Sequence, residues 1–230
     1  MIVAVAGGKG GVGKSTLTYN LGAALSAVVV DADLGMADLP TGPGPDLHDV
    51  LAGRAAPTEA VREGRVRLLP CGRSLSGARA ADVRDLGDAI RSVADEYGDV
   101  VVDCPAGLRA DVGVPLAVAD ACLVVTSPRR FALADAMRTR ELARELDAGL
   151  VGVAVNRVVE SPPTDAVERA LGAPVTVIPA DPRVGQSIAE NRPVVRAAPE
   201  SEAAQGIEAL AAAIQRNSRW SLRPQGATEA

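Results

Sequence analysis

The chain alternates between short, strongly hydrophobic runs and longer segments in which apolar residues recur at helical spacing. The short runs are apolar throughout, which is typical of parallel strands that are covered on both faces. They predict strands at 2–6, 27–31, 66–70, 100–103, 121–126, 150–156 and 174–178. The segments between them predict helices near 14–26, 79–96, 108–119, 131–147, 164–171, 183–191 and 201–216. This alternation predicts a doubly wound α/β fold, with a mainly parallel sheet and helices on both of its faces.

Polar and charged residues gather directly after the predicted strands. The first strand ends in a glycine-rich loop, and later strands end in DAD at 31–33, DCPAG at 103–107, TSPRR at 126–130, NR at 156–157 and PADP at 179–182. In a doubly wound sheet, ligands bind in the crevice beyond the carboxyl ends of the strands. One edge of the sheet is therefore predicted to carry the functional site.

Length and composition fit one ordinary globular domain. The chain has 230 residues, of which 47% are hydrophobic and only 2% aromatic, so valine, alanine and leucine must fill the core. We expect the domain to span residues 1–216 and a flexible tail to occupy residues 217–230. The formal net charge of −5 argues against broad binding of nucleic acid, although a local basic patch is compatible with it.

The cysteines and the lengths of the hydrophobic runs indicate in which cellular compartment the protein is expected. Cys71, Cys104 and Cys122 lie far apart and form no CxxC pair, which is typical of unpaired thiols in a reducing cytosol. No apolar run is long enough for a transmembrane helix. The N-terminal run leads directly into a glycine-rich loop, unlike a signal peptide. We therefore expect a cytoplasmic protein.

The glycine-rich loop carries the strongest chemical signal. Its sequence GKGGVGKS at 8–15 fits G-x-x-x-x-G-K-[ST] between a strand and a helix. Glycines let successive backbone N–H groups surround phosphate oxygens, and the following helix N-terminus favours an anion. We expect Lys14 to reach the β- and γ-phosphates of a nucleotide, Ser15 to ligate Mg²⁺ and Thr16 to contact the α-phosphate; a turn without a ligand is the alternative. The predicted phosphate-binding residues are Gly8, Lys9, Gly10, Gly11, Val12, Gly13, Lys14, Ser15 and Thr16.

Lysine occurs only at Lys9 and Lys14, whereas the chain has 22 arginines. The stretch KGGVGKST at 9–16 resembles the deviant phosphate loop of the MinD/ParA family of ATPases. In that family the first lysine crosses a nucleotide-sandwich dimer to the phosphates of the partner chain, and the resemblance implies this role for Lys9. A compact ammonium group suits a crowded phosphate cradle better than a broad guanidinium group. The alternative for Lys9 is a solvated surface charge.

The resemblance extends through roughly residues 1–195. The stretch VVVDADLGMADL at 28–39 resembles the first switch segment of the family, which implies that Asp33 orients or activates the attacking water. Asp31 either helps to hold magnesium through a water molecule or caps the loop. Asp38 stands where related sequences commonly carry asparagine, and we assign it no catalytic role.

The stretch VVVDCPAG at 100–107 resembles the Walker B strand and the second switch segment. The resemblance implies that Asp103 belongs to the magnesium shell and that Gly107 offers its N–H near the γ-phosphate. Cys104, beside Asp103, is interpreted as a small buried thiol rather than as a redox or metal-binding residue. The implied catalytic residues are therefore Lys9, Lys14 and Asp33, and the implied metal ligands are Ser15 and Asp103.

Two later stretches, 153–158 and 177–195, resemble the adenine pocket of the family and the segment that follows it. The resemblance implies that Asn156 reads the edge of the base and that Pro179 and Asp181 lie nearby.

Other residues depart from the family pattern or stand alone. Arg129 and Arg130 follow a proline where MinD relatives often carry an acidic residue. They are interpreted as a solvated pair, with contact to a partner or nucleotide as the alternative. His48 has no second histidine or cysteine at metal-binding spacing, and a structural role is expected for it.

The resemblance implies a cytoplasmic ATPase that binds Mg²⁺ and ATP, turns over slowly and is stimulated by a partner. ATP would favour a homodimer, and hydrolysis would release it. We interpret the chain as a MinD-like switch that positions cell-division or surface machinery, together with an unidentified activator or cargo protein. The alternatives are a ParA-type DNA segregation ATPase, which the net charge disfavours, a cofactor-maturation or iron–sulfur carrier ATPase, against which the missing CxxC counts, and a non-hydrolysing scaffold.

The C-terminal tail is predicted not to hold the monomer on a membrane. It offers Trp220 and Leu222 as large apolar residues before Pro224 blocks further helix. The free energy gained from burying two side chains and from attracting nearby arginines to an anionic surface is offset by the entropy lost on ordering the tail. A dimer would double these contacts and bind weakly. Any place at a membrane or cell pole is therefore expected to depend on partners.

Overall fold

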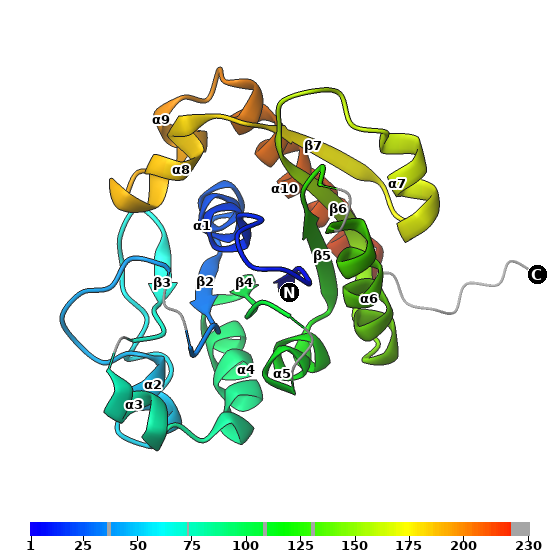
Figure 1. The fold of residues 1–230 in the computed structure, drawn as a ribbon. Coiled ribbons are helices and arrows are strands. Elements are labelled where there is room, and N and C mark those ends of the chain that lie inside the picture. Colours follow the sequence, from blue (N-terminus) through cyan, green and yellow to red (C-terminus); the bar gives the residue numbers. More distant parts are fainter. Residues whose placement is uncertain (36–37, 73, 108–109, 130–131, 222–230) are drawn as a thin grey trace, which may run out of the picture.

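The computed structural model describes residues 1–35, 38–72, 74–107, 110–129 and 132–221. At its centre is a seven-stranded sheet with the order β3-β2-β4-β1-β5-β6-β7, in which all neighbouring strands are parallel (Figure 1). The strands are β1 (Ile2–Ala6), β2 (Val28–Asp31), β3 (Arg67–Leu69), β4 (Val100–Asp103), β5 (Ala121–Thr126), β6 (Gly149–Val158) and β7 (Val175–Pro179). The predicted doubly wound α/β fold is confirmed.

Helices cover both faces of the sheet (Figure 1). One face carries α1 (Lys14–Leu25), α8 (Pro182–Ala189), α9 (Val194–Ala197) and α10 (Glu202–Ser221). The other face carries α2 (Leu47–Leu51), α3 (Leu75–Ala80), α4 (Leu86–Tyr97), α5 (Ala110–Val118), α6 (Ala132–Glu145) and α7 (Thr164–Leu171). Among the described residues, no helix combines the length and the apolarity that crossing a membrane requires.

The core consists of two apolar layers, one on each face of the sheet, because successive side chains of a strand point to opposite faces. In β1, Val3 and Val5 belong to the layer beneath α1 and α10, whereas Ile2, Ala4 and Ala6 belong to the layer beneath α4, α5 and α6. All of these side chains are buried. This two-sided burial explains why the strands are apolar throughout.

The short elements between β2 and β4 differ from the prediction. The single helix expected at 79–96 is instead α3, a 3-10 turn (Val83–Asp85) and α4. Asp82 is extended and its side chain accepts the N–H of Arg84, so the chain starts a new helix there. Helix α2 was not predicted, because its five residues are too few to show apolar periodicity; it starts at a reciprocal cap between Asp46 and Asp49.

Helix α10 is longer than predicted. It was expected to end at residue 216, with a tail from 217 onward, but it continues to Ser221. No proline or glycine interrupts residues 217–221, so nothing in their sequence stops the helix. Residues 222–230, including Leu222 and Pro224, lie outside the described residues.

Candidate nucleotide-binding site

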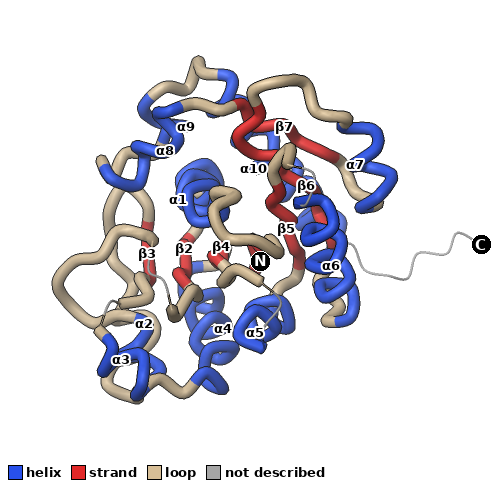
Figure 2. The backbone as a smooth tube through the Cα atoms, in the orientation of Figure 1, coloured by secondary structure: helices blue, strands red, loops and turns tan. Residues whose placement is uncertain are grey.

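The carboxyl ends of β1, β2 and β4 meet at one edge of the sheet. Asp31 at the end of β2 pairs in register with Asp103 at the end of β4, and Asp103 also pairs with Val5 of β1. The strands on the two sides of β1 are reached by connections that run in opposite directions, which makes this edge a topological switch point. In Figure 2 the loops that follow β1 and β4 lie between α1 and α5, and the loop that follows β2 lies beside α4.

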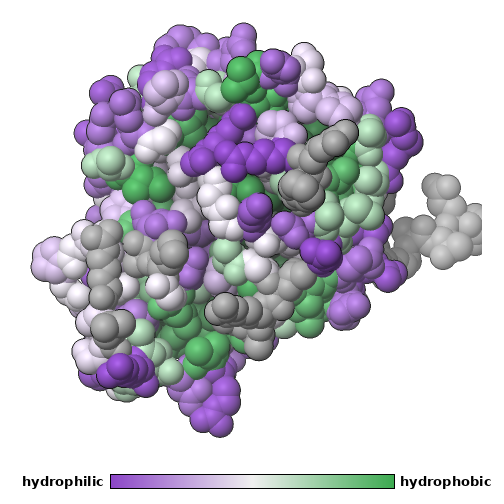
Figure 3. Space-filling model, in the orientation of Figure 1, coloured by the Kyte–Doolittle hydropathy of each residue, from purple (hydrophilic) through white to green (hydrophobic). Residues whose placement is uncertain are grey.

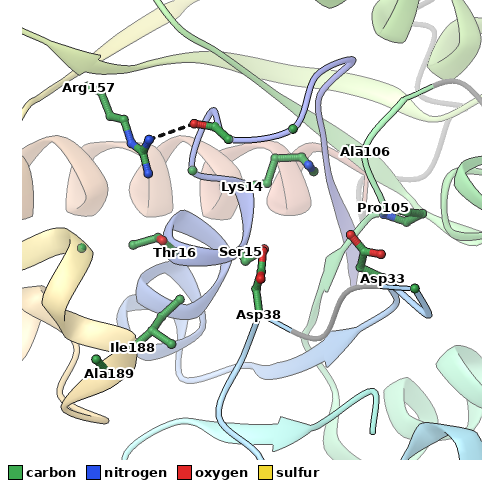
Figure 4. Close-up of a pocket in the computed structure, with 15 residues that line it drawn as sticks. Lys14, Ser15, Thr16, Asp33, Asp38, Pro105, Ala106, Arg157, Ile188 and Ala189 are labelled. Carbon is green, nitrogen blue, oxygen red and sulfur yellow. Dashed lines mark hydrogen bonds between the residues drawn. The ribbon is translucent and has the colours of Figure 1, made fainter. Parts of the chain in front are cut away.

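A cavity of about 660 Å³ lies at this edge (Figure 4). Its volume falls within the usual range for small-molecule sites. The phosphate loop and the start of α1 form one wall, and the segments after β2 and β4 form another. The lining residues are Gly10, Gly11, Gly13, Lys14, Ser15, Thr16, Asp33, Gly35, Asp38, Pro105, Ala106, Arg157, Gly185, Ile188 and Ala189. The structure therefore brings together most of the predicted phosphate-binding residues with Asp33.

The start of α1 is suited to an anion. The residue before the helix is Gly13, whose φ of 91° lies in the left-handed region that favours glycine. No side chain caps the helix and its first turn holds no acidic residue, so its first N–H groups remain available. Lys14, the first helical residue, is only 7% exposed.

The predicted metal ligand Asp103 is buried. Burial raises the pKa of its carboxyl group to about 7, although a hydrogen bond from Ser15 and the charge of Lys14 act in the opposite direction. The Thr18 hydroxyl lies 3.3 Å from its Oδ1 atom. Its Oδ2 atom has no hydrogen-bond partner among the described residues.

Asp31 is also buried, and its two oxygen atoms differ. Oδ1 accepts the backbone N–H of Asp33 at 3.3 Å, as the capping interpretation requires. The backbone N–H of Cys71 also acts on the carboxyl group, but among the described residues no partner of the buried Oδ2 atom has full hydrogen-bond geometry. Burial, and secondly the nearby Asp103, raise the pKa of Asp31 well above its ordinary value.

A divalent cation would provide a partner for Oδ2 of Asp31 and for Oδ2 of Asp103. Buried polar atoms normally have a partner, and a bound ion is one kind of partner that fits such an exception at a functional site. Mg²⁺ prefers oxygen ligands, keeps several waters and is commonly held by one or two carboxylates together with phosphate oxygens. The residues at this edge fit magnesium.

A second cavity, of about 460 Å³, adjoins the first and brings together the residues predicted to bind adenine. Asn156, Pro179 and Asp181 line it together with Thr16. The carboxylate of Asp181 also caps α8 and forms an ion pair with Arg183 at 2.8 Å. That carboxylate therefore has a structural role in addition to its place in the cavity wall.

Lys9 lies apart from Lys14. It is exposed and lines a third, smaller cavity of about 130 Å³ with Val12, Arg129 and Arg157. Lys9, Arg129 and Arg157 make no ion pair with any described residue. Figure 3 shows strongly hydrophilic side chains next to pale ones near the centre of this face of the molecule. Arg130 lies outside the described residues.

Two predicted phosphate-binding glycines do not line the main cavity. Gly8 packs against the start of α6, where an added Cβ atom would lie 2.7 Å from the backbone oxygen of Asp135. Gly107 is half-buried, and its neighbours Pro105 and Ala106 line the cavity instead. Their predicted contacts with nucleotide remain predictions.

His48 and Cys104 lie in the protein interior. The Nε2 atom of His48 is 3.3 Å from the carbonyl oxygen of Leu34 and 3.4 Å from the sulfur of Cys71. Cys104 is buried, and burial raises the pKa of its thiol. Both environments fit the structural roles expected from the sequence.

The sequence interpretation gave no role to Arg157, although it noted that Asn156 and Arg157 end a strand. Arg157 lines all three of these cavities. Gly185, Ile188 and Ala189 of α8 close another side of the main cavity and were also not assigned. The position of the NR pair at a strand end was the signal for Arg157; no comparable signal marks the α8 residues.

A phosphate loop at the switch point of a parallel sheet, beside paired carboxylates, defines a P-loop nucleotide-binding protein. Residues 3–194 match the family model described as the CobQ/CobB/MinD/ParA nucleotide-binding domain, and the chain belongs to this family. The resemblance to MinD/ParA proteins is thereby confirmed.

Individual relatives agree with this assignment. An uncharacterized ATP-binding protein of Methanocaldococcus jannaschii is 35% identical, over 92% of this chain and 86% of the relative. The crystal structure of the Pyrococcus furiosus cell division ATPase MinD superposes with a TM-score of 0.88 at 33% identity, covering 94% of this chain and 98% of that one. The septum site-determining protein MinD of Pyrococcus horikoshii, solved with Mg-ADP, gives a TM-score of 0.88 at 30% identity and covers 96% and 98%.

Proposed function

We propose that this protein is a magnesium-dependent ATPase in which ATP binding and slow hydrolysis control a switch between monomer and homodimer. The observation that carries the proposal is the placement of two lysines on one phosphate loop. Lys14 is buried beside the acidic edge of the sheet, whereas Lys9 is exposed among arginines. A buried lysine suits the phosphates of its own chain, and an exposed one can reach those of a second chain.

The residues of the main cavity have separate tasks in phosphoryl transfer, which depends mainly on positioning and on neutralising charge. Lys14 and the first N–H groups of α1 hold the phosphates at the sheet edge. Asp33 lines the same cavity and orients the attacking water by accepting a hydrogen bond from it. Ser15 and Asp103 would hold Mg²⁺, which would offset the negative charge of the phosphate oxygens.

The switch follows from the two segments that face the phosphates. Asp33 comes from the segment after β2, and Pro105 and Ala106 come from the segment after β4 (Figure 4). Contacts with the γ-phosphate order both segments and favour the dimer, and loss of that phosphate releases them. The output is therefore the population of dimers, which a partner protein adjusts by stimulating hydrolysis.

We infer that this switch works in the cytoplasm and helps to position other proteins within the cell. It reaches the membrane or the cell pole through its partners. The Pyrococcus furiosus relative is described as a cell division ATPase, which supports a MinD-like role in positioning division or surface machinery. The net charge of −5 supports a protein partner more than DNA.

Localisation of the tagged protein in its native cells tests this role. We expect the wild type to concentrate at a defined site, Asp33→Ala to accumulate there because it retains ATP, and Lys14→Ala to be spread evenly. A partner should be captured with Asp33→Ala and not with Lys14→Ala. Even distribution of all three proteins would contradict the proposal, and coincidence with the chromosome would replace it with DNA segregation.

A further inference from the structure

The end of β6 has an irregular backbone next to the phosphate loop. The pairing of β6 with β7 slips between Asn156 and Val158, and Arg157 has a φ of 59°, in the left-handed region. In a regular strand, neighbouring side chains point to opposite faces. The bulge removes this alternation, so that Asn156 and Arg157 both reach the phosphate loop.

Each of these side chains binds one carbonyl of the loop. The Nδ2 atom of Asn156 donates to the carbonyl oxygen of Val12 at 2.9 Å. The Nη1 atom of Arg157 donates to the carbonyl oxygen of Gly11 at 2.9 Å, which is the dashed line in Figure 4. The Oδ1 atom of Asn156 accepts the backbone N–H of Arg157 at 3.0 Å, which fixes the orientation of the amide. Two consecutive carbonyls of the loop are therefore held by two consecutive residues of one strand.

Holding a carbonyl also orients the next N–H, because the two groups of a trans peptide point in opposite directions. Fixing the carbonyls of Gly11 and Val12 therefore fixes the N–H groups of Val12 and Gly13. The contact is close: a Cβ atom on Gly13 would lie 2.4 Å from Nδ2 of Asn156. Only glycine at this position allows Asn156 to approach.

We propose that Asn156 and Arg157 form a clamp that pre-organises the N–H groups of Val12 and Gly13 for phosphate, so that Arg157 is a positioning residue for nucleotide binding. The proposal rests on the proposed nucleotide site and deepens it. Asn156 also borders the predicted base cavity, so its role in the clamp must be separated from recognition of the base. A ligand that has phosphates but no base makes this separation.

The test is calorimetric binding of Mg·ATP and of magnesium inorganic triphosphate to the wild type, Arg157→Ala, Asn156→Ala and Arg157→Lys. The clamp predicts that each alanine variant loses about tenfold in affinity for both ligands, the effect of one hydrogen bond to a loop that must be rigid. Arg157→Lys retains a donor and should recover part of the loss. Arg91→Ala, an arginine on the surface of α4 paired with Asp88, is the matched control and should bind like the wild type.

NMR order parameters of the ligand-free loop separate positioning from simple attraction of phosphate by a cation. The clamp predicts lower order parameters for the N–H groups of Val12 and Gly13 in Arg157→Ala, at equal global stability, whereas a purely electrostatic role leaves them unchanged. Loss of affinity for ATP but not for triphosphate would overturn the clamp in favour of a base contact, and unchanged binding of both would overturn it outright. If the wild type itself binds neither ligand, the proposed function fails instead.

Discussion

The two sides of the phosphate loop differ in how their charges are balanced. On the inner side, Lys14 is buried and its charge acts on Asp103 within the same chain. On the outer side, Lys9, Arg129 and Arg157 surround a small cavity, and none of them forms an ion pair with a described residue. The inner side is the nucleotide site that we propose for a single chain. On the outer side, Arg157 binds the carbonyl oxygen of Gly11, whereas Lys9 and Arg129 are exposed and could meet an anion of a second chain. This difference is what the dimer proposal explains.

The largest expected effect is on the inner side. Lys14→Ala should lower the affinity for Mg·ATP by about 100-fold or more, because it removes a charge-assisted contact with phosphate from a buried site. Equilibrium binding of a fluorescent ATP analogue measures this change, with Arg91→Ala as the control. Affinity within a few fold of the wild type would show that Lys14 does not hold the phosphates.

A second effect concerns stability without nucleotide. Asp31 has a raised pKa in the folded protein, so over the range between its unfolded and folded pKa values the folded state binds more protons than the unfolded state. The free energy of unfolding then falls as pH rises through that range. Asp31→Asn removes the ionisable group and should stabilise the nucleotide-free protein, more at pH 8 than at pH 5, because ionisation of the buried carboxyl group at the higher pH is what lowers the free energy of unfolding.

Urea denaturation at the two pH values tests this prediction. Asp88→Asn, which changes an exposed carboxylate on α4, is the control and should have little effect. If Asp31→Asn destabilises the protein equally at both pH values, the loop cap that Asp31 provides contributes more to stability than burial of its charge costs.

The smallest expected effect is at the rim of the outer side. Arg129 is exposed and shares a cavity with Lys9. Arg129→Ala should leave ATP binding by the monomer unchanged and weaken the ATP-dependent dimer by about threefold, the effect of one partly exposed charge. Sedimentation equilibrium measures the dimer constant. If the dimer constant is unchanged, Arg129 is a solvated surface charge, as the sequence interpretation suggests.

The inner side could be predicted from the sequence, and much of the outer side could not. Apolar runs gave the strands, and the loop motif with its flanking strand and helix gave Lys14 and Ser15, because these signals are local. The role of Arg157 depends on a bulge in β6, which residue spacing does not reveal. Helix α2 was missed for a different reason: its five residues are too few to show apolar periodicity, although Asp46 and Asp49 have the spacing of a helix cap.

The central claim is that Lys9 acts across a dimer that ATP induces. Light scattering of Asp33→Ala with Mg·ATP tests it most directly, because slow hydrolysis lets the dimer accumulate. We predict a mass of twice the 23.4 kDa of one chain with ATP and of one chain with ADP. The double variant Lys9→Ala/Asp33→Ala should bind ATP with nearly the affinity of Asp33→Ala and yet stay at the mass of one chain. A full dimer of that double variant in ATP would contradict the account.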